Sequence, residues 1–231
     1  MSFSTQDEEG VKIHDNKLVD LIRNLNFTQA VYYTWTGRYP SDKEEAMLNA
    51  CLLAFIDHGP EALIAKTARL AVSGGAEMHA AIAAGILAAG KHHGTTPLQK
   101  STLMFREAVE AKVPAADVVK SYLDAGERMP GYGHRLYKDE DPRTIALLAK
   151  AEELGFADEH VKLAREIEEE LEKQKGKKLC LNVDGAVGAI LPGLGIGPDQ
   201  APGTFLLSRM VGLVMHVTEE QKEKPGRMRI S

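Results

Sequence analysis

A short stretch of the chain, GYGHRLYKDEDPR at residues 131–143, combines a glycine loop, a histidine and an arginine. Gly131 and Gly133 carry no side chain, which predicts a tight loop whose backbone N–H groups are open to a ligand. His134 can take up or release a proton near neutral pH. Asp141 is expected to cap a helix that begins at Pro142. Arg143 then lies in the first turn, and its guanidinium suits a bidentate contact with a carboxylate. We predict part of an active site for a small polycarboxylate, although the composition of the segment alone fits a surface loop equally well.

Two further segments carry groups for proton transfer. His93, in KHHG at 91–94, ends an alanine-rich helix and could donate a hydrogen bond to a substrate oxygen. The alternatives for His93 are exposure to solvent together with His92, or a zinc site. No Cys/His/Asp grouping has ligand spacing, so no metal is expected. Asp184 lies inside the apolar stretch LCLNVDGAVGAIL, where a carboxylate is costly to bury unless it is paired, protonated or functional. A raised pKa would suit a general base, and the alternative is a helix N-cap.

Basic side chains at three other places could hold anions. Arg209 lies within the apolar helix FLLSRMVGLVMH, and a partly buried cation needs an anionic partner. His58, in DHGP, lies near the predicted end of a helix, where a capping histidine is the better interpretation in isolation. Lys177 and Lys178 belong to a basic turn that fits either a solvated surface or contacts with ligand phosphates.

The composition limits the class of protein. The 231 residues are 44% hydrophobic and 26% charged, which is an ordinary globular balance. The formal net charge of −5 argues against a nucleic-acid partner. We expect a cytoplasmic protein without a membrane partner, because there is neither a signal-peptide core nor an uninterrupted apolar span. Cys51 and Cys180 lie among apolar neighbours and are expected to be buried free thiols.

The elements that must position these groups are predicted to be helices almost throughout. Ala, Leu, Glu and Lys dominate, and no alternation of apolar and polar residues is long enough for a sheet. Residues 1–16 are expected to be an extended or frayed lead-in, and Ser41 with Glu44 to form a capping box. Helices are predicted at about 17–25, 28–36, 41–57, 60–72, 76–91, 97–111, 114–127, 142–154, 157–175 and 201–221. The fold class is therefore all-α.

Five sequence blocks in this order resemble the citrate synthase family. They are DHG at 57–59, KHHG at 91–94, GYGHRLYKDEDPR at 131–143, NVDG at 182–185 and SR at 208–209. The resemblance covers most of the chain from about residue 45. The chain is shorter than the synthases, and its DHGP and LNVDG look more like the citryl-CoA lyase module of ATP-citrate lyase and the stand-alone citryl-CoA lyases.

The resemblance implies a role for each candidate residue. The catalytic set would be His93, which stabilises the enolate of the thioester, His134, which acts at the oxaloacetate carbonyl or citryl hydroxyl, and Asp184, which deprotonates the acetyl methyl group. Substrate carboxylates would be bound by His58, Arg143, Arg209 and Arg227, although Lys224 and Arg229 compete with Arg227 for the place of an arginine that reaches a partner subunit. Coenzyme A would meet Gly131, Tyr132 and Gly133, with its phosphates near Lys177 and Lys178.

The same resemblance implies a fold and an activity. We expect a citrate-synthase-like all-α fold with a large lobe at 1–94 and 191–231, a small lobe at 95–190, and a dimer or a dimer of dimers. The leading function is a citryl-CoA lyase that gives acetyl-CoA and oxaloacetate, with coenzyme A only as part of substrate and product and no metal. The alternatives are a compact citrate synthase or 2-methylcitrate synthase, and a non-catalytic module that binds a CoA ester within a larger assembly.

Overall fold

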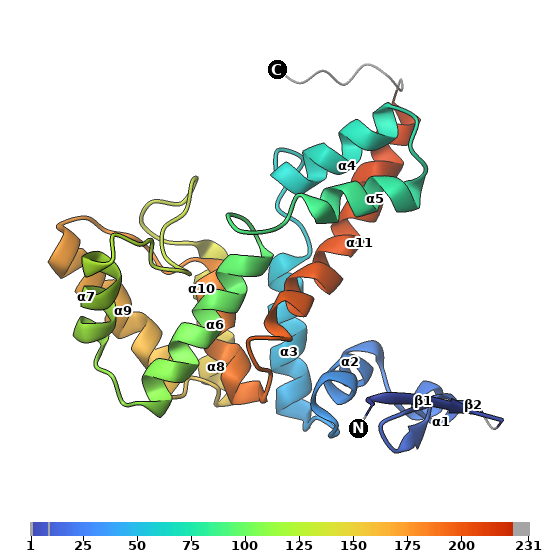
Figure 1. The fold of residues 1–231 in the computed structure, drawn as a ribbon, viewed down its shortest axis with the longest axis horizontal. Coiled ribbons are helices and arrows are strands. Elements are labelled where there is room, and N and C mark those ends of the chain that lie inside the picture. The colour runs from blue at the N-terminus through green and yellow to red at the C-terminus, as the bar shows by residue number, and fades with distance from the viewer. Residues whose placement is uncertain (1, 9, 224–231) are drawn as a thin grey trace.

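The computed structural model describes residues 2–8 and 10–223. It confirms the predicted all-α class, because helices form nearly all of the regular structure in the described ranges (Figure 1). The helices are α1 (Leu18–Asn24), α2 (Phe27–Thr36), α3 (Asp42–Phe55), α4 (Leu63–Ser73), α5 (Met78–Leu87), α6 (Thr95–Glu110), α7 (Ala115–Asp124), α8 (Pro142–Leu154), α9 (Glu159–Lys175), α10 (Val183–Ile190), the 3-10 helix η1 (Leu191–Leu194) and α11 (Ala201–Lys222).

The N-terminal segment differs from the prediction. The prediction was an extended or frayed lead-in; the chain is extended here, but it forms a small antiparallel sheet in the order β1-β2-β3, with strands β1 (Ser4–Asp7), β2 (Gly10–Ile13) and β3 (Asn16–Lys17). Strands this short cannot show the alternation that predicts a sheet. Contacts from α2 stabilise them instead: Tyr33 donates its hydroxyl proton to the Ile13 carbonyl, and Asn16 donates to the Tyr33 hydroxyl.

Helix ends follow local capping chemistry. The capping box of Ser41 and Glu44 is present as predicted, and Asp141 caps α8 with proline at the first helical position. The helix α3 ends at Phe55, two residues before the predicted end. Beyond it, the Asp57 carboxylate accepts a hydrogen bond from the Gly59 N–H at 2.9 Å, which stabilises a turn in place of a further helical residue.

The packing brings distant segments together around α11. In Figure 1 this long helix runs past α3, α4, α5 and α6, and it contacts all four. The helices α6 and α10 pack closely on each other, while α9 contacts α6, α7 and α10. One hydrophobic core extends through these contacts, with Phe55, Phe105 and Phe205 among its largest fully buried or nearly buried side chains. The ends of α3, α8, α10 and the middle of α11 are thereby placed around one site.

Two further expectations can be compared with the structure. Cys51 and Cys180 are buried free thiols, as predicted. Within residues 2–8 and 10–223, the helices are either too short or too polar to cross a membrane.

Candidate active site

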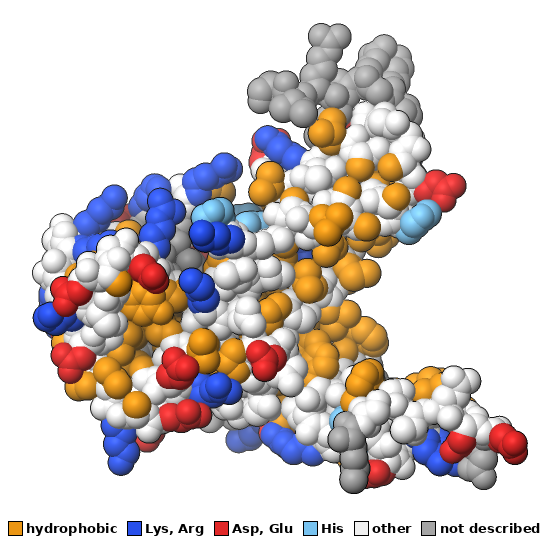
Figure 2. Space-filling model, in the orientation of Figure 1, with side chains coloured by type: hydrophobic (Ala, Val, Ile, Leu, Met, Phe, Trp, Pro, Cys, Tyr) orange, Lys and Arg blue, Asp and Glu red, His pale blue; other side chains and the backbone are white. Residues whose placement is uncertain are grey.

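Arg143 lies at the centre of a cluster of histidines. Its Nη1 is 3.3 Å from His58 Nδ1, and its Nη2 is 3.4 Å from His134 Nε2. The rings of His58 and His134 meet edge to face, with their centroids 5.4 Å apart. His58 is therefore in contact with His134 and Arg143, which lie far from it in the sequence, as the prediction of a shared site requires. Figure 2 shows histidine side chains beside Lys and Arg side chains on the face it draws.

The guanidinium of Arg143 is held by an internal carboxylate that the sequence analysis treated only as a helix cap. Asp141 is 1% exposed, and its two carboxylate oxygens accept hydrogen bonds from Nε and Nη2 of Arg143 at 3.0 and 2.7 Å. Burial alone would raise the pKa of Asp141, but the hydrogen bonds and charge of Arg143 outweigh it and lower that pKa. Arg143 is thus preorganised, with Nη1 left to face the cluster.

The ring of His134 is surrounded by N–H donors. The N–H groups of Leu136 and Tyr137 both donate to Nδ1 at 3.1 Å, and Nη2 of Arg143, which can only donate, lies 3.4 Å from Nε2. The Tyr137 ring stacks on it with centroids 4.7 Å apart. Burial, followed by the charge of Arg143, lowers the pKa of His134, which keeps the ring neutral near pH 7.

The other two histidines are also neutral near physiological pH. Burial, followed by the charge of Arg143, lowers the pKa of His58 to about 4. His58 does not cap α3, so the alternative interpretation of this residue is wrong. Burial, followed by the charge of Arg209, lowers the pKa of His93. The Nε2 atom of His93 is buried and has no hydrogen-bond partner among the described residues, so the alternative of a solvent-exposed side chain is also wrong.

Arg209 presents a second unsatisfied group. It is 2% exposed, its Nε donates to the Phe55 carbonyl at 2.8 Å, and its guanidinium carbon lies 5.0 Å from the centre of the Phe205 ring. Its Nη1 is buried without a partner within the described ranges. Burial lowers the pKa of Arg209 to about 10, which leaves it a cation at neutral pH. A buried cation with a free hydrogen-bond donor strongly favours the binding of an anionic ligand.

Asp184 lies in the first turn of α10 and does not cap it. The cap is Asn182, whose side chain accepts hydrogen bonds from the N–H groups of Asp184 and Gly185. Burial raises the pKa of Asp184 from 3.8 to about 7, although the charges of Arg143 and Arg209 lower it. Its carboxylate accepts no hydrogen bond from any residue in 2–8 or 10–223. The alternative of an N-cap is therefore wrong, and the carboxyl group can exchange a proton near neutral pH.

The glycine loop is as tight as predicted, but its backbone is partly occupied. Gly131 and Gly133 have φ angles of 85° and 80°, which favour glycine, and a Cβ on Gly131 would lie 2.6 Å from the Cα of Gly185. The N–H of Gly133 donates to the Cys180 carbonyl at 2.7 Å. The Tyr132 hydroxyl donates to the Ala164 carbonyl. The amide of Gly133 is therefore not open to a ligand, and any contact of this loop with coenzyme A must use other atoms.

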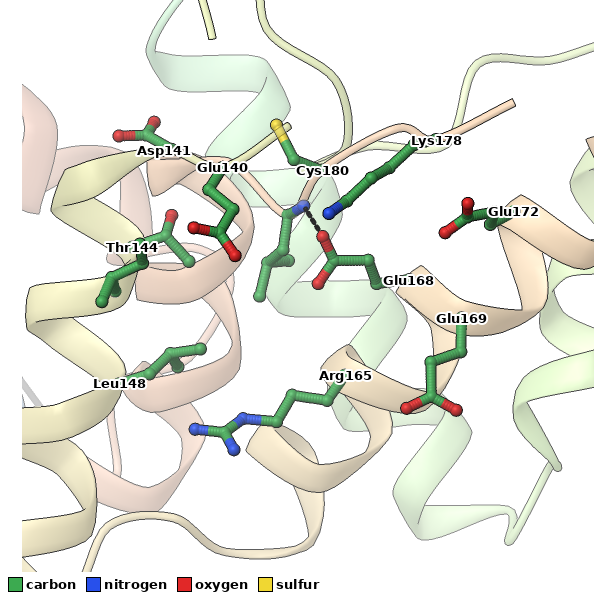
Figure 3. A pocket seen from close by; sticks show the side chains of 12 residues that line it. Glu140, Asp141, Thr144, Leu148, Arg165, Glu168, Glu169, Glu172, Lys178 and Cys180 are labelled. Carbon is green, nitrogen blue, oxygen red and sulfur yellow. Dashed lines mark hydrogen bonds between the residues drawn. The ribbon is translucent and has the colours of Figure 1, made fainter. Parts of the chain in front are cut away.

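The two predicted phosphate-binding lysines are exposed, as the sequence suggested. Lys178 lines a pocket of about 350 Å³ between α8 and α9, which Asp141 also lines (Figure 3). Its other lining side chains include Glu168, Glu169 and Glu172, so the immediate surroundings of Lys178 are acidic. The role of Lys177 and Lys178 stays a prediction.

Neither the predicted C-terminal carboxylate binder nor the expected absence of a metal is decided by a contact in the site. Arg227, together with its competitors Lys224 and Arg229, lies outside the described residues. Within the described ranges, no group of three or more His, Cys, Asp or Glu side chains is arranged to hold a metal ion.

Some residues that hold the site in place through hydrogen bonds were not predicted from the sequence. Asp57 accepts a hydrogen bond from His216 Nε2 at 2.9 Å, which ties the loop before His58 to α11. The Ser101 hydroxyl donates to the Asp184 carbonyl oxygen at 3.0 Å. A buried histidine in an apolar helix was the available signal for His216, whereas nothing local distinguishes Ser101.

Fold and site together define an all-α protein whose candidate site combines cationic and titratable side chains. Two guanidinium groups, three neutral imidazoles and one carboxyl group with a pKa near 7 act on one another there.

Comparison with known proteins places this class in one family. Residues 9–230 match the family model of the citrate synthase C-terminal domain. The chain is 30% identical over 205 residues to a citrate synthase of Haloferax volcanii, covering 87% of this chain and 53% of that protein. The chain belongs to the citrate synthase family. It spans about half the length of the curated relatives it matches first.

Solved structures agree with this assignment. The citryl-CoA lyase from Hydrogenobacter thermophilus has a TM-score of 0.93 and 40% sequence identity, covering 100% of this chain and 90% of that one. The ATP citrate lyase from Methanothrix soehngenii, solved in complex with citrate and coenzyme A, has a TM-score of 0.86 at 23% identity. It covers 99% of this chain and 40% of that one, and at this identity the likeness shows a shared fold. The predicted resemblance and the citrate-synthase-like fold are confirmed.

Proposed function

We propose that this protein is a citryl-CoA lyase, which cleaves citryl-CoA to acetyl-CoA and oxaloacetate. One observation carries the proposal: His93 Nε2 and Arg209 Nη1 are buried without partners among the described residues, in the same electrostatic cluster as Asp184. Unpaired buried donors are costly, so a ligand with matching oxygens is favoured there. A thioester carbonyl and a substrate carboxylate supply such oxygens.

The cations of the site suit the carboxylates of the citryl group. Arg209 offers its free Nη1, and Arg143 offers the side of its guanidinium that is not bound to Asp141. Nδ1 of the neutral His58 ring accepts from Arg143, so its Nε2–H can donate one further hydrogen bond. Asp141 offsets the charge of Arg143, but both guanidinium groups keep a nitrogen that is not bound to a carboxylate, which favours a substrate that carries carboxylates.

Cleavage requires three groups acting together. As the carbon–carbon bond breaks, its electrons pass to the acetyl carbon to give an enolate, which the Nε2 donor of His93 stabilises at the thioester oxygen. The tertiary hydroxyl becomes the oxaloacetate carbonyl, and its proton passes to His134. Protonated Asp184 delivers its proton to the enolate carbon to form the acetyl methyl group. A proton then returns from His134 to Asp184 through solvent, which restores the starting state.

The hydrogen-bond partners of His134 add a condition to this sequence. To accept the hydroxyl proton of citryl-CoA, Nε2 must be unprotonated, and the neutral ring then carries its proton on Nδ1. In this structure the Leu136 and Tyr137 amides donate to Nδ1, and Arg143 Nη2 faces Nε2. We therefore expect substrate binding to be coupled to a rearrangement of residues 134–137.

Several features favour the lyase over the alternatives. The citryl-CoA lyase structure matches over the full chain at 40% identity, and the DHGP and LNVDG blocks resemble that group. A citrate synthase or 2-methylcitrate synthase would have to hydrolyse the thioester as well. A non-catalytic CoA-ester module would not need an acid near pKa 7 beside two neutral histidines.

We also propose that the chain works as a homo-oligomer, a dimer or a dimer of dimers, with a large lobe at 1–94 and 191–231 and a small lobe at 95–190. Figure 2 shows hydrophobic side chains along the hollow on the side of α3, α4 and α11. Exposed apolar residues on these helices and on α5 are Leu53, Leu63, Leu70, Leu87, Met210, Val211, Val214 and Met215. An apolar surface of this extent favours burial against a second copy.

Product analysis with citryl-CoA tests the proposal. The protein is incubated with citryl-CoA, and the products are separated by chromatography. We expect acetyl-CoA and oxaloacetate, and we expect His134→Ala to abolish turnover while keeping the far-UV circular dichroism of the parent. Citrate and free coenzyme A would establish a synthase instead, and binding without turnover would establish the non-catalytic module.

A further inference from the structure

The side chain of Asn182 makes hydrogen bonds with the peptide groups of both residues that exchange protons in the proposed reaction. Its Oδ1 accepts from the N–H of Asp184 at 3.0 Å and from the N–H of Gly185 at 3.1 Å. Its Nδ2 donates to the carbonyl of Gly133 at 2.8 Å. That carbonyl belongs to the peptide unit whose nitrogen is that of His134.

The backbone around Asn182 strengthens this link. Its N–H donates to the Gly131 carbonyl at 2.9 Å, and the Gly133 N–H donates to the Cys180 carbonyl at 2.7 Å. The residues on either side, 180–182 and 131–133, therefore run as a short antiparallel pair. The donor and acceptor ends of the side-chain amide each face a matching group, which leaves one orientation for it.

We infer that Asn182 is a positioning residue that sets the placement of His134 relative to Asp184, and that the amide nitrogen of its side chain is essential to this role. The inference rests on the proposed function, because it concerns the same pair of groups. A cap on α10 alone needs only an oxygen, which Asp or Ser supplies. The hydrogen bond from Asn182 Nδ2 to the Gly133 carbonyl plays no part in capping α10. It fixes the loop that leads into His134.

Asn182→Asp isolates the inferred role. It keeps an oxygen for the Asp184 and Gly185 amides but places a second oxygen against the Gly133 carbonyl, where two acceptors repel. Displacements of about 1 Å at a reacting group cost about 100-fold in rate, so we expect kcat for citryl-CoA cleavage to fall about 100-fold while KM changes less than about threefold. The added carboxylate also raises the pKa of Asp184, so the alkaline limb of the pH–rate profile moves to higher pH.

Asn26 supplies a matched control. Its side chain also caps a helix, α2, through Oδ1, and its Nδ2 donates to Glu45 at 2.6 Å. Asn26→Asp makes the same chemical change at a cap outside the cluster of Arg143, His58 and His134. We expect its kcat and pH profile to equal those of the parent, which separates positioning from a general effect of altered capping.

Amide hydrogen exchange measured by mass spectrometry gives a readout that does not depend on activity. We expect peptides covering 131–137 to exchange at least about tenfold faster in Asn182→Asp than in the parent and in Asn26→Asp. Unchanged exchange there, or faster exchange with kcat within about threefold of the parent, would overturn the inference. If the parent itself does not cleave citryl-CoA, the proposed function fails, and the exchange result alone then supports or overturns the coupling by Asn182.

Discussion

Replacing Asp184 with asparagine should stabilise the protein while abolishing its activity. The carboxyl group is placed where burial raises its pKa from 3.8 to about 7, and no described residue donates a hydrogen bond to it. Above neutral pH the folded protein must therefore hold an ionised group in surroundings that favour the neutral form. Asparagine is close to the same shape and carries no charge, so Asp184→Asn removes this cost together with the exchangeable proton.

The size of the effect follows from the shift in pKa. Because the folded-state pKa of Asp184 lies above the unfolded-state value, ionisation opposes folding, and the cost is absent below the unfolded-state pKa. It grows as pH rises from 3.8 towards about 7. At about 1.4 kcal/mol for each pKa unit, the cost is under about 2 kcal/mol at about pH 5 and about 4 kcal/mol at about pH 8. The difference in stability between Asp184→Asn and the parent should therefore widen by about 2–3 kcal/mol across this range.

Urea unfolding at these two pH values measures the difference. Parent and variant are compared at one protein concentration, because assembly changes apparent stability. Asp124→Asn, on the exposed surface of α7, is the control, and its difference from the parent should stay within about 0.5 kcal/mol at both pH values. A difference for Asp184→Asn that does not change with pH would refute the raised pKa, and with it the role of Asp184 as an acid at neutral pH.

Three further results are expected. Gly185→Ala should lower stability by at least about 2 kcal/mol in urea unfolding and remove activity, because its Cβ would lie within 3 Å of the Gly131 backbone. Gly74→Ala is the control, since its Cβ would make only ordinary contacts. For citryl-CoA cleavage, kcat/KM should fall above about pH 7, because the reaction uses protonated Asp184; a fall below that pH instead would assign the carboxylate form to catalysis. Val214→Glu should weaken self-association at least about 100-fold in sedimentation equilibrium, because it places an unpaired charge in the proposed interface.

Helices were predictable where their signals are local. The capping box at Ser41 and the cap and proline at the start of α8 both appear in the structure. The small N-terminal sheet was not predictable, because its strands have two to four residues and depend on contacts with Tyr33 in α2. Strand pairing of this kind is fixed by tertiary contacts and leaves little periodicity.

The contacts between the histidines and the arginine of the candidate site were predictable, but the residues that support them were not. His58, His134 and Arg143 form contacts with one another, as the family resemblance implied. Asp141 was interpreted as a cap. Its hydrogen bonds with Arg143 depend on the conformation of the Arg143 side chain, which the sequence does not show. Asn182 lacks any local mark of its link to the Gly133 carbonyl, since the two are distant in the sequence. Long-range hydrogen bonds to backbone groups leave no pattern in side-chain types.

The close approach of Gly131 and Gly185 has a consequence for how this site can evolve. The histidine loop and the helix that carries Asp184 touch backbone to backbone, because neither residue has a Cβ. Any single substitution at either position separates the two segments at once, and a second substitution in the other cannot restore the contact, because it adds further atoms. Adaptation to other substrates therefore has to proceed through the other side chains of the candidate site, while this pair of residues stays constant.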